Sequence, residues 1–487
     1  MSKNFYLTTT LPYVNADPHV GFAMEIIRTD AIVRYKKLQD FDVFFNTGTD
    51  EHGQKVFQKA NEAGIDPQTY VDDYATRFKE LLPALHISPD IHFTRTTNPD
   101  HKAAAQEFWL RCLAKGDIYK KQYKIKYCIG CELEKTESEL ENGRCTLHPN
   151  LEIEIREEEN YFFAFSKYQQ ALLDFYKANP DFVIPDFRFN EIKAFVERGL
   201  EDFSISRLKS KMSWGVPVPG DEDHVMYVWF DALVNYISVL GWPNSPVGTA
   251  GEHKSLFDQF WVEGTPTQYC GKDNLRQQSA MWQAMLMSAG IPNSRNIIIN
   301  GFITSEGGVK MSKSLGNVIS PFDMVNEYGA EALRYYMLRE LSPFEDSPMT
   351  LEGFKVAYNA NLANGLGNLT SRIMKLASTH LESSVAVEDT PLTHEYMGAM
   401  QMFNIQKAME TIWAEIGKID ARIQSEQPFK VIKENKEEGI TMIQKLVQDL
   451  YAVAKMLEPM LPQTSETIQT LIRENKMPEQ PLFLRKE

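Results

Sequence analysis

Two lysines in a short polar segment have the most distinctive spacing of the charged residues in this sequence. The segment Val-Lys-Met-Ser-Lys-Ser-Leu-Gly-Asn occupies residues 309–317 and follows Gly307 and Gly308. A mobile cationic loop of this kind can close over a triphosphate and neutralise the charge that grows on a departing pyrophosphate. We expect Lys310 and Lys313 to act in phosphate chemistry, because a solvated basic turn explains this pentapeptide poorly.

A second candidate for phosphate chemistry lies near the N-terminus, where Pro18-His19-Val20-Gly21 precedes a helix-like pattern. The start of a helix offers N–H groups and a partial positive charge, which suit a phosphate. Gly21 lets the backbone approach a ligand closely, and His19 can donate a hydrogen bond to a phosphate oxygen. Taken alone, the motif is explained more often by a surface histidine at a helix start.

Three of the five cysteines cluster with a histidine in two short pairs, each with two intervening residues. The four residues are Cys128, Cys131, Cys145 and His148. Two such pairs on two turns can place four ligands around one tetrahedral zinc ion. The N-terminus lacks the features of a signal peptide, so we expect a reducing cytoplasm, where this spacing favours zinc over a disulfide. With all four positions filled by protein, the zinc is expected to be structural.

The elements that position these residues follow an alternating pattern. Residues 5–9 form a strand-like run, residues 21–38 have apolar positions at helical spacing, and residues 41–45 form a second strand-like run that ends at a turn. The pattern returns at residues 227–230, 267–270 and 296–303. Such alternation is typical of a parallel α/β sheet.

Two other regions depart from this alternation. The region from about residue 117 to 220 contains the cysteine cluster, a charged run and several prolines, which indicates an inserted domain. Beyond about residue 351 the pattern is helical, and residues 443–457 carry an apolar stripe at helical spacing. Cys112 and Cys270, outside the cluster, are expected to be ordinary buried thiols.

The overall composition limits the class of protein. A length of 487 residues suggests about three domains, and 43% hydrophobic residues are normal for a globular chain. The net charge of −15 argues against non-specific binding of polyanions, although local patches can still bind a nucleic acid. No apolar stretch approaches the roughly 20 residues that span a bilayer.

The order of the motifs resembles that of class I aminoacyl-tRNA synthetases. His19-Val20-Gly21 comes before the first helix, and Lys310-Met311-Ser312-Lys313-Ser314 follows about 290 residues later. Further segments narrow the resemblance to the methionyl-tRNA synthetase family. These segments begin at Leu11 (LPYVN), Gly48 (GTDEHG), Tyr227 (YVWFDA), Gly271 (GKD) and Asn368 (NLTSR).

The resemblance implies a Rossmann-type parallel-sheet catalytic domain that is split by a zinc-knuckle insertion and followed by an α-helical bundle. The expected boundaries are 1–116 and 221–304 for the two halves of the catalytic domain, 117–220 for the insertion, 305–352 for the lysine loop and a stem-contact region, and 353–487 for a helical anticodon-binding domain. Many members of this family carry one or two zinc knuckles, and only one ligand set is present here.

The resemblance also implies the residues of an amino-acid site. Asp50 matches the aspartate that binds the substrate ammonium. The residues that match the pocket for the methionine side chain are Leu11, Tyr13, Trp229, Tyr236 and Gln278. An apolar, polarizable pocket suits a thioether, although without the resemblance plain core packing explains each aromatic residue better.

For ATP, the resemblance implies phosphate contacts from His19 and Lys313, with Lys310 as the first lysine of the mobile loop and Gly21 at the helix start. The residues that match ribose contacts are Glu25, Gly271 and Asp273. Arg207 matches an active-site arginine, which could pair with growing negative charge or with a carboxylate. Magnesium is expected together with the ATP phosphates.

For tRNA, the resemblance implies anticodon reading by Asn368 and Arg372, which lie four residues apart on one helix face. Phe429 stands where the family usually has tryptophan; a phenyl ring still stacks on a base but lacks the indole donor. The expected partners are therefore tRNA(Met), ATP and L-methionine. The sequence stops soon after the helical stripe, so we expect no appended dimerisation domain, and a monomer.

Four positions depart from the family pattern. Phe22, Gln278 and Asn300 each stand where a histidine is usual, and Asn274 stands where an apolar residue is usual. Because both lysines, Asp50 and Trp229 remain, we expect a variant active site with normal function.

The expected reaction has two steps: methionine and ATP give methionyl-adenylate and pyrophosphate, and the terminal ribose hydroxyl of tRNA then attacks the adenylate. Two alternatives remain. One is a synthetase for another aliphatic amino acid, although an insertion of about 100 residues is small for an editing domain. The other is a non-catalytic tRNA-binding paralogue.

Overall fold

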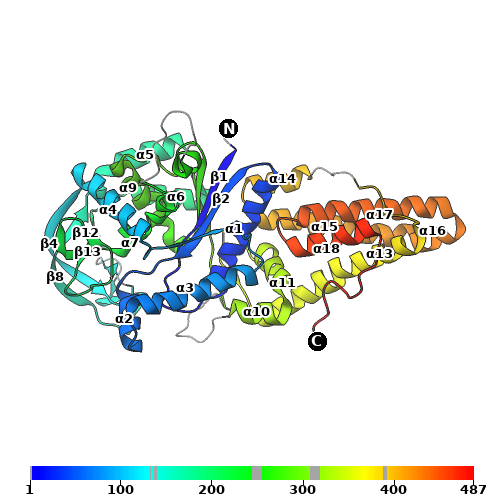
Figure 1. Ribbon diagram of the computed structural model, residues 1–487, viewed down its shortest axis with the longest axis horizontal. Coiled ribbons are helices and arrows are strands. Elements are labelled where there is room, and N and C mark those ends of the chain that lie inside the picture. The colour runs from blue at the N-terminus through cyan, green and yellow to red at the C-terminus, as the bar shows by residue number, and fades with distance from the viewer. Residues whose placement is uncertain are drawn as a thin grey trace. The chain divides into compact units, whose positions relative to one another are not determined.

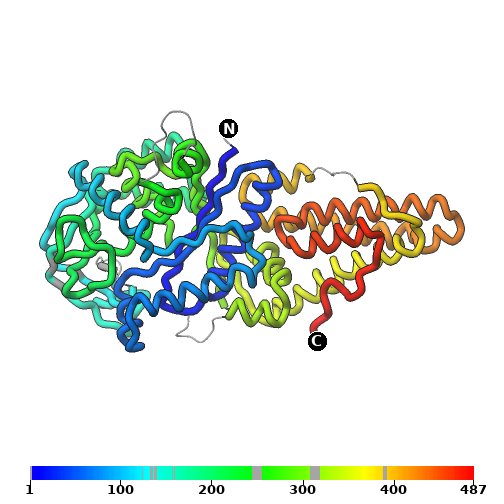
Figure 2. Tube along the Cα trace, viewed as in Figure 1, coloured from blue at the N-terminus to red at the C-terminus, as the bar shows by residue number. Residues whose placement is uncertain are grey.

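The chain is described here by a computed structural model that covers residues 3–131, 133–135, 140–243, 255–305, 307, 319–387 and 392–487 (Figure 1). Two compact units are present. The first contains Met1–Asp17, Asp42–Lys79 and Ile91–Ile299, and the second contains Pro18–Phe41, Glu80–Asp90 and Asn300–Glu487. The backbone therefore passes from one unit to the other several times, as can be followed by colour in Figure 2.

A six-stranded sheet forms the centre of the first unit, with strand order β3-β2-β1-β14-β15-β9. The strands are β1 Asn4–Thr9, β2 Asp42–Thr49, β3 His92–Arg95, β9 Val183–Ile184, β14 Thr265–Gly271 and β15 Asn296–Asn300. The pairs β1 with β2, β1 with β14, β2 with β3 and β15 with β9 are parallel. Strands β2 and β3 lie on one side of β1, and β14, β15 and β9 lie on the other. The strand order therefore reverses between β1 and β14, and such sheets bind ligands in the crevice at the carboxyl ends of these two strands.

Two sequence expectations in this sheet were wrong in detail. The turn expected at residues 46–48 lies inside β2, which continues to Thr49. Gly48 is needed in this strand, because a Cβ atom there would lie 1.8 Å from the carbonyl oxygen of Thr94. Residues 227–230 are mostly helical: α7 spans Val228–Ala232, and the preceding strand is β13, Asp221–Met226.

Apart from β9, which belongs to the six-stranded sheet, the strands of the inserted region are antiparallel. The longest are β4 Ile118–Cys128 and β8 Glu154–Phe163, which pair along their whole length. The shorter strands are β5 Leu133–Glu134, β6 Leu140–Glu141, β7 Arg144–Cys145, β10 Phe203–Ser204, β11 Ser206–Leu208 and β12 Pro217–Val218. Helices α5 Gln169–Ala178 and α6 Asp186–Glu197 lie between β8 and β10 in the chain.

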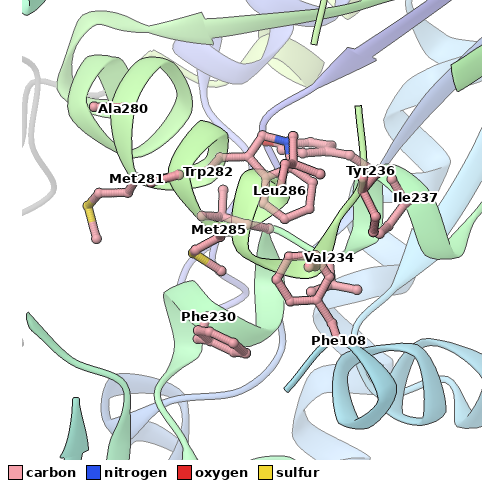
Figure 3. Close-up of a cluster of buried hydrophobic side chains, with 14 of the residues drawn as sticks. Phe108, Phe230, Val234, Tyr236, Ile237, Ala280, Met281, Trp282, Met285 and Leu286 are labelled. Atoms are coloured by element: carbon pink, nitrogen blue, oxygen red, sulfur yellow. The ribbon is translucent and has the colours of Figure 1, made fainter. Parts of the chain in front are cut away.

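Aromatic and aliphatic side chains pack together in the apolar core of the first unit (Figure 3). Phe108, from α4 Pro99–Ala114, stacks on Trp282 at a centroid distance of 5.4 Å. Trp282 begins α9, Trp282–Ala289, and also contacts Tyr236 of α8, Asn235–Ser238, at 6.0 Å. Each such burial contributes about 1.5–3 kcal/mol, and this core holds the apolar side chains of the short helices α7 and α8.

Helices form most of the second unit. They are α1 Val20–Leu38, α10 Pro321–Tyr328, α11 Ala330–Tyr335, α12 Leu351–Ala357, α13 Asn368–His380, α14 His394–Gln401, α15 Ile405–Glu426, α16 Pro428–Glu434, α17 Lys436–Leu457 and α18 Pro462–Glu474. Helix α17 packs against α13, α15 and α18 (Figure 1). Its buried residues include the predicted apolar stripe, so the expected C-terminal helical bundle is confirmed. Two further helices are α2 Gln54–Ala63 in the first unit and α3 Pro67–Ala84.

Two fully buried arginines tie α1 to its neighbours within the second unit. Arg334 lies 2.8 Å from the Asp30 carboxylate and also donates to the carbonyl oxygen of Met460. Arg28 donates to the carbonyl oxygens of Met337 and Leu341. Because each buried charge has several partners, α1 has one well-defined position in this unit. Within the described parts of the chain, no helix is long and apolar enough to cross a membrane.

Candidate active site and metal centre

A pair of backbone hydrogen bonds places Tyr13 beside Asp50 at the carboxyl ends of β1 and β2. The Asp50 N–H donates to the carbonyl oxygen of Pro12 at 3.0 Å, and the Val14 N–H donates to that of Asp50 at 3.3 Å. The Asp50 side chain is only 4% exposed. A carboxylate in such a weakly screened position attracts a cation strongly, so the crevice can hold the ammonium group of an amino acid.

The residue after Asp50 is clamped in place. The Glu51 carboxylate accepts hydrogen bonds from Arg95 at 2.6 Å and 3.0 Å and from Thr49 at 2.6 Å. Its backbone carbonyl oxygen accepts a bond from the indole N–H of Trp214 at 2.6 Å. Since the neighbouring backbone and side chain are both restrained, Asp50 is held with little freedom to move.

A buried aspartate links the Asp50 loop to α7. Asp231 is fully buried and lies 2.6 Å from His52 Nδ1 and 2.8 Å from His101 Nε2. Burial alone would raise the pKa of Asp231, but the two histidines outweigh this effect and hold the pKa well below its usual range. His101 Nδ1 lies 3.0 Å from the hydroxyl of Ser238 in α8.

The expected pocket residues lie on the same unit. Trp229 in α7 is half-buried, and Tyr236 in α8 is buried. The Gln278 amide, 1% exposed, donates from Nε2 to the Tyr236 hydroxyl at 2.6 Å. Tyr6 in β1 donates to the backbone carbonyl of Tyr236 at 2.9 Å. These contacts bring Tyr236 and Gln278 together and fix α8 to the sheet.

The expected nucleotide residues of the first unit lie at the end of β14. Gly271 is the last residue of that strand, and Asp273 is exposed in the short 3₁₀ turn Lys272–Asn274. The Asn274 amide donates to Asp273 at 3.2 Å. Arg207 in β11 lies over the Tyr227 ring at 4.2 Å and donates to the carbonyl oxygen of Ser206, so its guanidinium has a fixed direction.

The first motif of the sequence lies in the second unit. His19 is the N-cap of α1, and its Nδ1 accepts a 3.0 Å hydrogen bond from the Gly21 N–H. This bond makes Nε2 the protonated nitrogen. A Cβ atom at position 21 would lie 2.7 Å from the His19 ring, so a side chain there would displace the ring from this position. Glu25 and Phe22 are both buried in α1, while Lys310 and Lys313 lie outside the described residues.

The four predicted metal ligands lie together. Their ligand atoms, from Cys128, Cys131, Cys145 and His148, are all within 4.8 Å of one another. Ligands of a tetrahedral zinc, at Zn–S bonds of about 2.3 Å, are separated by about 3.8 Å, so the set fits one ion. Although burial opposes it, hydrogen bonds from Cys131 and His148 lower the pKa of the Cys145 thiol to about 6. Gly130 leaves room for the imidazole, since a Cβ atom there would lie 2.5 Å from His148.

The expected anticodon residues lie on the helices of the second unit. Asn368 begins α13 and is exposed, and Arg372 follows one turn later. The Arg372 guanidinium pairs with Asp420 of α15, which also accepts a 2.6 Å hydrogen bond from Gln424. Phe429 in α16 is 41% exposed, so a base could stack on its ring.

Comparison with known proteins decides the family. A family model described as "tRNA synthetases class I (M)" matches residues 5–137 and 130–374. The chain belongs to the class I methionyl-tRNA synthetases. The methionine–tRNA ligase of Thermosynechococcus vestitus is 40% identical over 486 residues, which cover 96% of this chain and 90% of that protein.

Solved structures and other relatives agree with this family. Mycobacterium tuberculosis methionyl-tRNA synthetase in complex with methionyl-adenylate superposes with a TM-score of 0.89 at 34% identity, over 100% of both chains. The methionine–tRNA ligase of Thermotoga maritima is 39% identical, over 95% of this chain and 74% of that protein. The family and the fold class expected from the sequence are therefore confirmed.

The sequence did not predict the buried polar residues that connect the Asp50 loop with α7 and α8. His52, His101, Asp231 and Ser238 are separated by up to 186 positions in the chain, and no local spacing predicts that they meet. The sequence contained one indication of these residues. His52 follows the candidate substrate residue Asp50 by two positions in GTDEHG, and Asp231 follows Trp229 by two positions in YVWFDA.

The departures from the family pattern have local consequences in the structure. Asn300 is 3% exposed, and its side-chain amide donates to the carbonyl oxygen of Gly301. The backbone at Gly301 lies close to Glu345, because a Cβ atom added at Gly301 would lie 2.1 Å from the carbonyl oxygen of Glu345. Phe22 is 7% exposed and packs in α1 as an apolar residue. Phe22 is thus accommodated, whereas Asn300 Oδ1 is buried without a hydrogen-bond partner among the described residues.

Proposed function

We propose that this class I synthetase uses ATP to activate L-methionine and transfers the methionyl group to the 3′ end of tRNA(Met), releasing AMP and pyrophosphate. The observation that carries the proposal is the buried Asp50 carboxylate, held beside Tyr13 at the carboxyl ends of two parallel strands. This position suits the ammonium of an amino acid.

The methionine site that we propose consists of Asp50 and five pocket residues. The pocket residues are Leu11, Tyr13, Trp229, Tyr236 and Gln278. Aromatic faces and an aliphatic side chain provide polarizable contacts for a thioether. The Gln278 amide sets the direction of the Tyr236 hydroxyl, at 2.6 Å, and so shapes the apolar wall.

Residues of both units are proposed to contact the nucleotide. In the first unit, Gly271 and Asp273 are assigned to the ribose, and Arg207 to negative charge that grows during the reaction. In the second unit, Glu25 is assigned to the ribose, His19 to the phosphates through Nε2–H, and Gly21 to close approach of the backbone. The loop residues Lys310 and Lys313 neutralise the pyrophosphate.

The protein acts mainly by positioning and by charge neutralisation. Asp50 orients the ammonium so that the methionine carboxylate faces the α-phosphate, and the cationic residues stabilise the leaving pyrophosphate. Mg²⁺ bound with ATP supplies further charge neutralisation on the phosphates. The ribose hydroxyl of tRNA then attacks the adenylate, and we assign no side-chain base to this step.

The zinc knuckle is proposed to be structural. Three thiolates and one imidazole are a complete tetrahedral set, so Cys128, Cys131, Cys145 and His148 would hold one zinc ion and leave no open position for a substrate. The ion would connect the turns of the inserted region.

We propose the division into domains at 1–116, 117–220, 221–304, 305–352 and 353–487, with anticodon reading by Asn368, Arg372 and Phe429. Stacking on an exposed ring and hydrogen bonds from a guanidinium suit single-stranded bases. We further propose that the enzyme is a cytoplasmic monomer.

ATP–pyrophosphate exchange with each of the twenty amino acids tests the proposal. Exchange should depend on methionine, and D50N should raise the KM for methionine by about tenfold or more, because a buried charge pair is lost. Exchange with leucine, isoleucine or valine instead would indicate another aliphatic specificity. Binding of tRNA without any exchange by zinc-loaded protein would indicate a non-catalytic paralogue and overturn the proposal.

A further inference from the structure

A buried chain of four polar side chains connects three elements of the first unit that carry candidate methionine residues. The chain runs from His52 through Asp231 and His101 to Ser238, with separations of 2.6, 2.8 and 3.0 Å. The exposed fraction is 2% for both histidines, 0% for Asp231 and 9% for Ser238. These side chains therefore interact with one another in a medium that screens charge weakly.

Three of these four polar residues lie two positions after a residue that we propose to contact the substrate. His52 lies two positions after Asp50, Asp231 two positions after Trp229, and Ser238 two positions after Tyr236. His101 is the one member without such a neighbour, and it comes from α4, which packs in the core beside α7 and α8. The four side chains thus join the Asp50 loop, α7 and α8, which carry the residues that we propose to face methionine.

The carboxylate of Asp231 sets the donor and the acceptor in two of the three contacts. Asp231 is an acceptor on both oxygens, so His52 donates from Nδ1 and His101 donates from Nε2. His101 Nδ1 and the Ser238 hydroxyl form the third contact, and this hydroxyl also donates to the carbonyl oxygen of Asn235 at 3.4 Å. Each carboxylate oxygen of Asp231 thus has one histidine partner, and loss of either histidine would leave one buried oxygen without that donor.

Two of the elements that these four polar residues join are helices too short to be stable by themselves. Helix α7 has five residues and α8 has four, and helices of this length have no independent stability in water. The clamp on Glu51 comes from Arg95, Thr97 and Trp214, so it restrains the Asp50 loop without reaching α7. The contact between His52 and Asp231 is the charged link from that loop to Trp229.

We propose that Asp231, with His52, His101 and Ser238, is a positioning network that sets the spacing between Asp50, Trp229 and Tyr236 and thereby tunes methionine binding. The proposal rests on the methionine site proposed above. None of the four residues is assigned a contact with the substrate, so each acts through the element that carries it.

Substitution of the central carboxylate gives the main test. In D231N the charge is removed, and the amide accepts from one histidine but presents an N–H to the other, which keeps its contact only by taking the opposite tautomer. The KM for methionine in ATP–pyrophosphate exchange should rise by about tenfold, while the KM for ATP should change by less than about twofold. A purely structural role would instead lower the active fraction and leave both KM values unchanged.

A pair of substitutions at His101 separates hydrogen bonding from packing. In H101Q the amide N–H can reach Asp231, so the KM for methionine should stay within about threefold of wild type. In H101L the volume is kept but the donor is lost, and the KM should rise as in D231N, by about tenfold. S238A removes the contact with His101 and a long hydrogen bond of 3.4 Å to the carbonyl oxygen of Asn235, and it should raise the KM by about threefold. This mild change provides a readout if D231N does not fold.

Asp117 provides a matched control in the same unit. It is 4% exposed and accepts hydrogen bonds from Tyr168 at 2.5 Å and Ser288 at 2.8 Å, away from the candidate site residues in sequence and contacts. D117N should lower the melting temperature and leave the ratio of the two KM values unchanged.

Two results would have different meanings. If D50N raises the KM for methionine while D231N, H101L and S238A leave the KM ratio within about twofold of wild type, the positioning network is refuted. If D50N itself leaves the KM for methionine unchanged, the proposed methionine site is wrong, and the network loses its basis with it.

Discussion

At the scale of single residues, the amide of Gln278 is an unusual neighbour for an apolar substrate. Its Nε2 donates to Tyr236, but its Oε1 is buried and has no hydrogen-bond partner among the residues that the structure describes. A buried carbonyl without a partner costs about 1–3 kcal/mol. The side chain therefore orients the Tyr236 hydroxyl at the expense of folding stability.

Replacing this amide by an apolar group of similar size separates the two effects. In Q278L the unpaired oxygen is removed, so the free energy of unfolding should stay the same or rise by about 1 kcal/mol. The Tyr236 hydroxyl loses its donor, and the KM for methionine should rise by about fivefold. Thermal unfolding and exchange kinetics measure the two quantities. A lower melting temperature together with an unchanged KM would contradict this account.

At the scale of elements, sequence periodicity predicted regular structure well where the pattern was long. The stripe at residues 443–457 lies within α17, and the run at 5–9 lies within β1. Short apolar runs were ambiguous. Residues 227–230 look like a strand, but tertiary packing of Phe230 against Phe108 and Trp109 holds them as the helix α7.

The candidate site shows the same division between local and distant information. The cysteine cluster was predictable, because its ligands lie within 21 consecutive positions and metal geometry dictates the spacing. The pairing of Arg372 with Asp420 was not predictable, because these residues are 48 positions apart on separate helices. Contacts of this kind depend on how helices pack, which periodicity alone does not determine.

The metal cluster gives a prediction for the inserted region. Purified protein should contain about one zinc ion per chain, and a strong chelator should remove it and lower the melting temperature, since ligand binding is coupled to local folding. Mass spectrometry of bound metal measures the content. C145S should lose the zinc, while C112S, a substitution at a fully buried thiol outside the cluster, should retain it. Equal zinc content in both variants would refute the ligand assignment.

The buried pair between Asp30 and Arg334 makes the second unit sensitive to acid. Burial would raise the pKa of Asp30, but Arg334, Arg34 and the Ser88 hydroxyl outweigh it, so the pKa in the folded state is lowered. A carboxyl with a lowered pKa stabilises the folded state above its unfolded value of about 3.9, and this stability is lost as pH falls through the folded pKa.

The variant D30N tests this assignment. At pH 7 it should lower the free energy of unfolding by about 3–5 kcal/mol, because it leaves Arg334 buried without its counter-charge. It should also reduce the loss of stability of the wild type below about pH 4. Urea unfolding between pH 7 and pH 3 measures both effects. An equally steep acid dependence in D30N would assign the sensitivity to other carboxyls.

At the scale of the whole molecule, a net charge of −15 is unfavourable for a protein that binds RNA. Recognition must therefore depend on a few well-placed groups, and the proposed anticodon residues fit this requirement. Arg372 is held by Asp420, which is itself held by Gln424. A guanidinium restrained in this way loses little entropy on binding a base, although it must share its charge with a carboxylate.

Because activation and anticodon reading are assigned to different residues, they should respond separately to mutation. In R372A the catalytic efficiency of aminoacylation with tRNA should fall by about 10–100-fold, since one directed contact to a base is worth about 1–3 kcal/mol. ATP–pyrophosphate exchange, which needs no tRNA, should be unchanged. R422A is the matched control: Arg422 is a half-buried arginine of α15 that pairs with Asp449, and its loss should leave aminoacylation within about threefold of wild type. If R422A and R372A reduce aminoacylation equally, the loss reflects positive charge near the RNA, and Arg372 is not a reader of the anticodon.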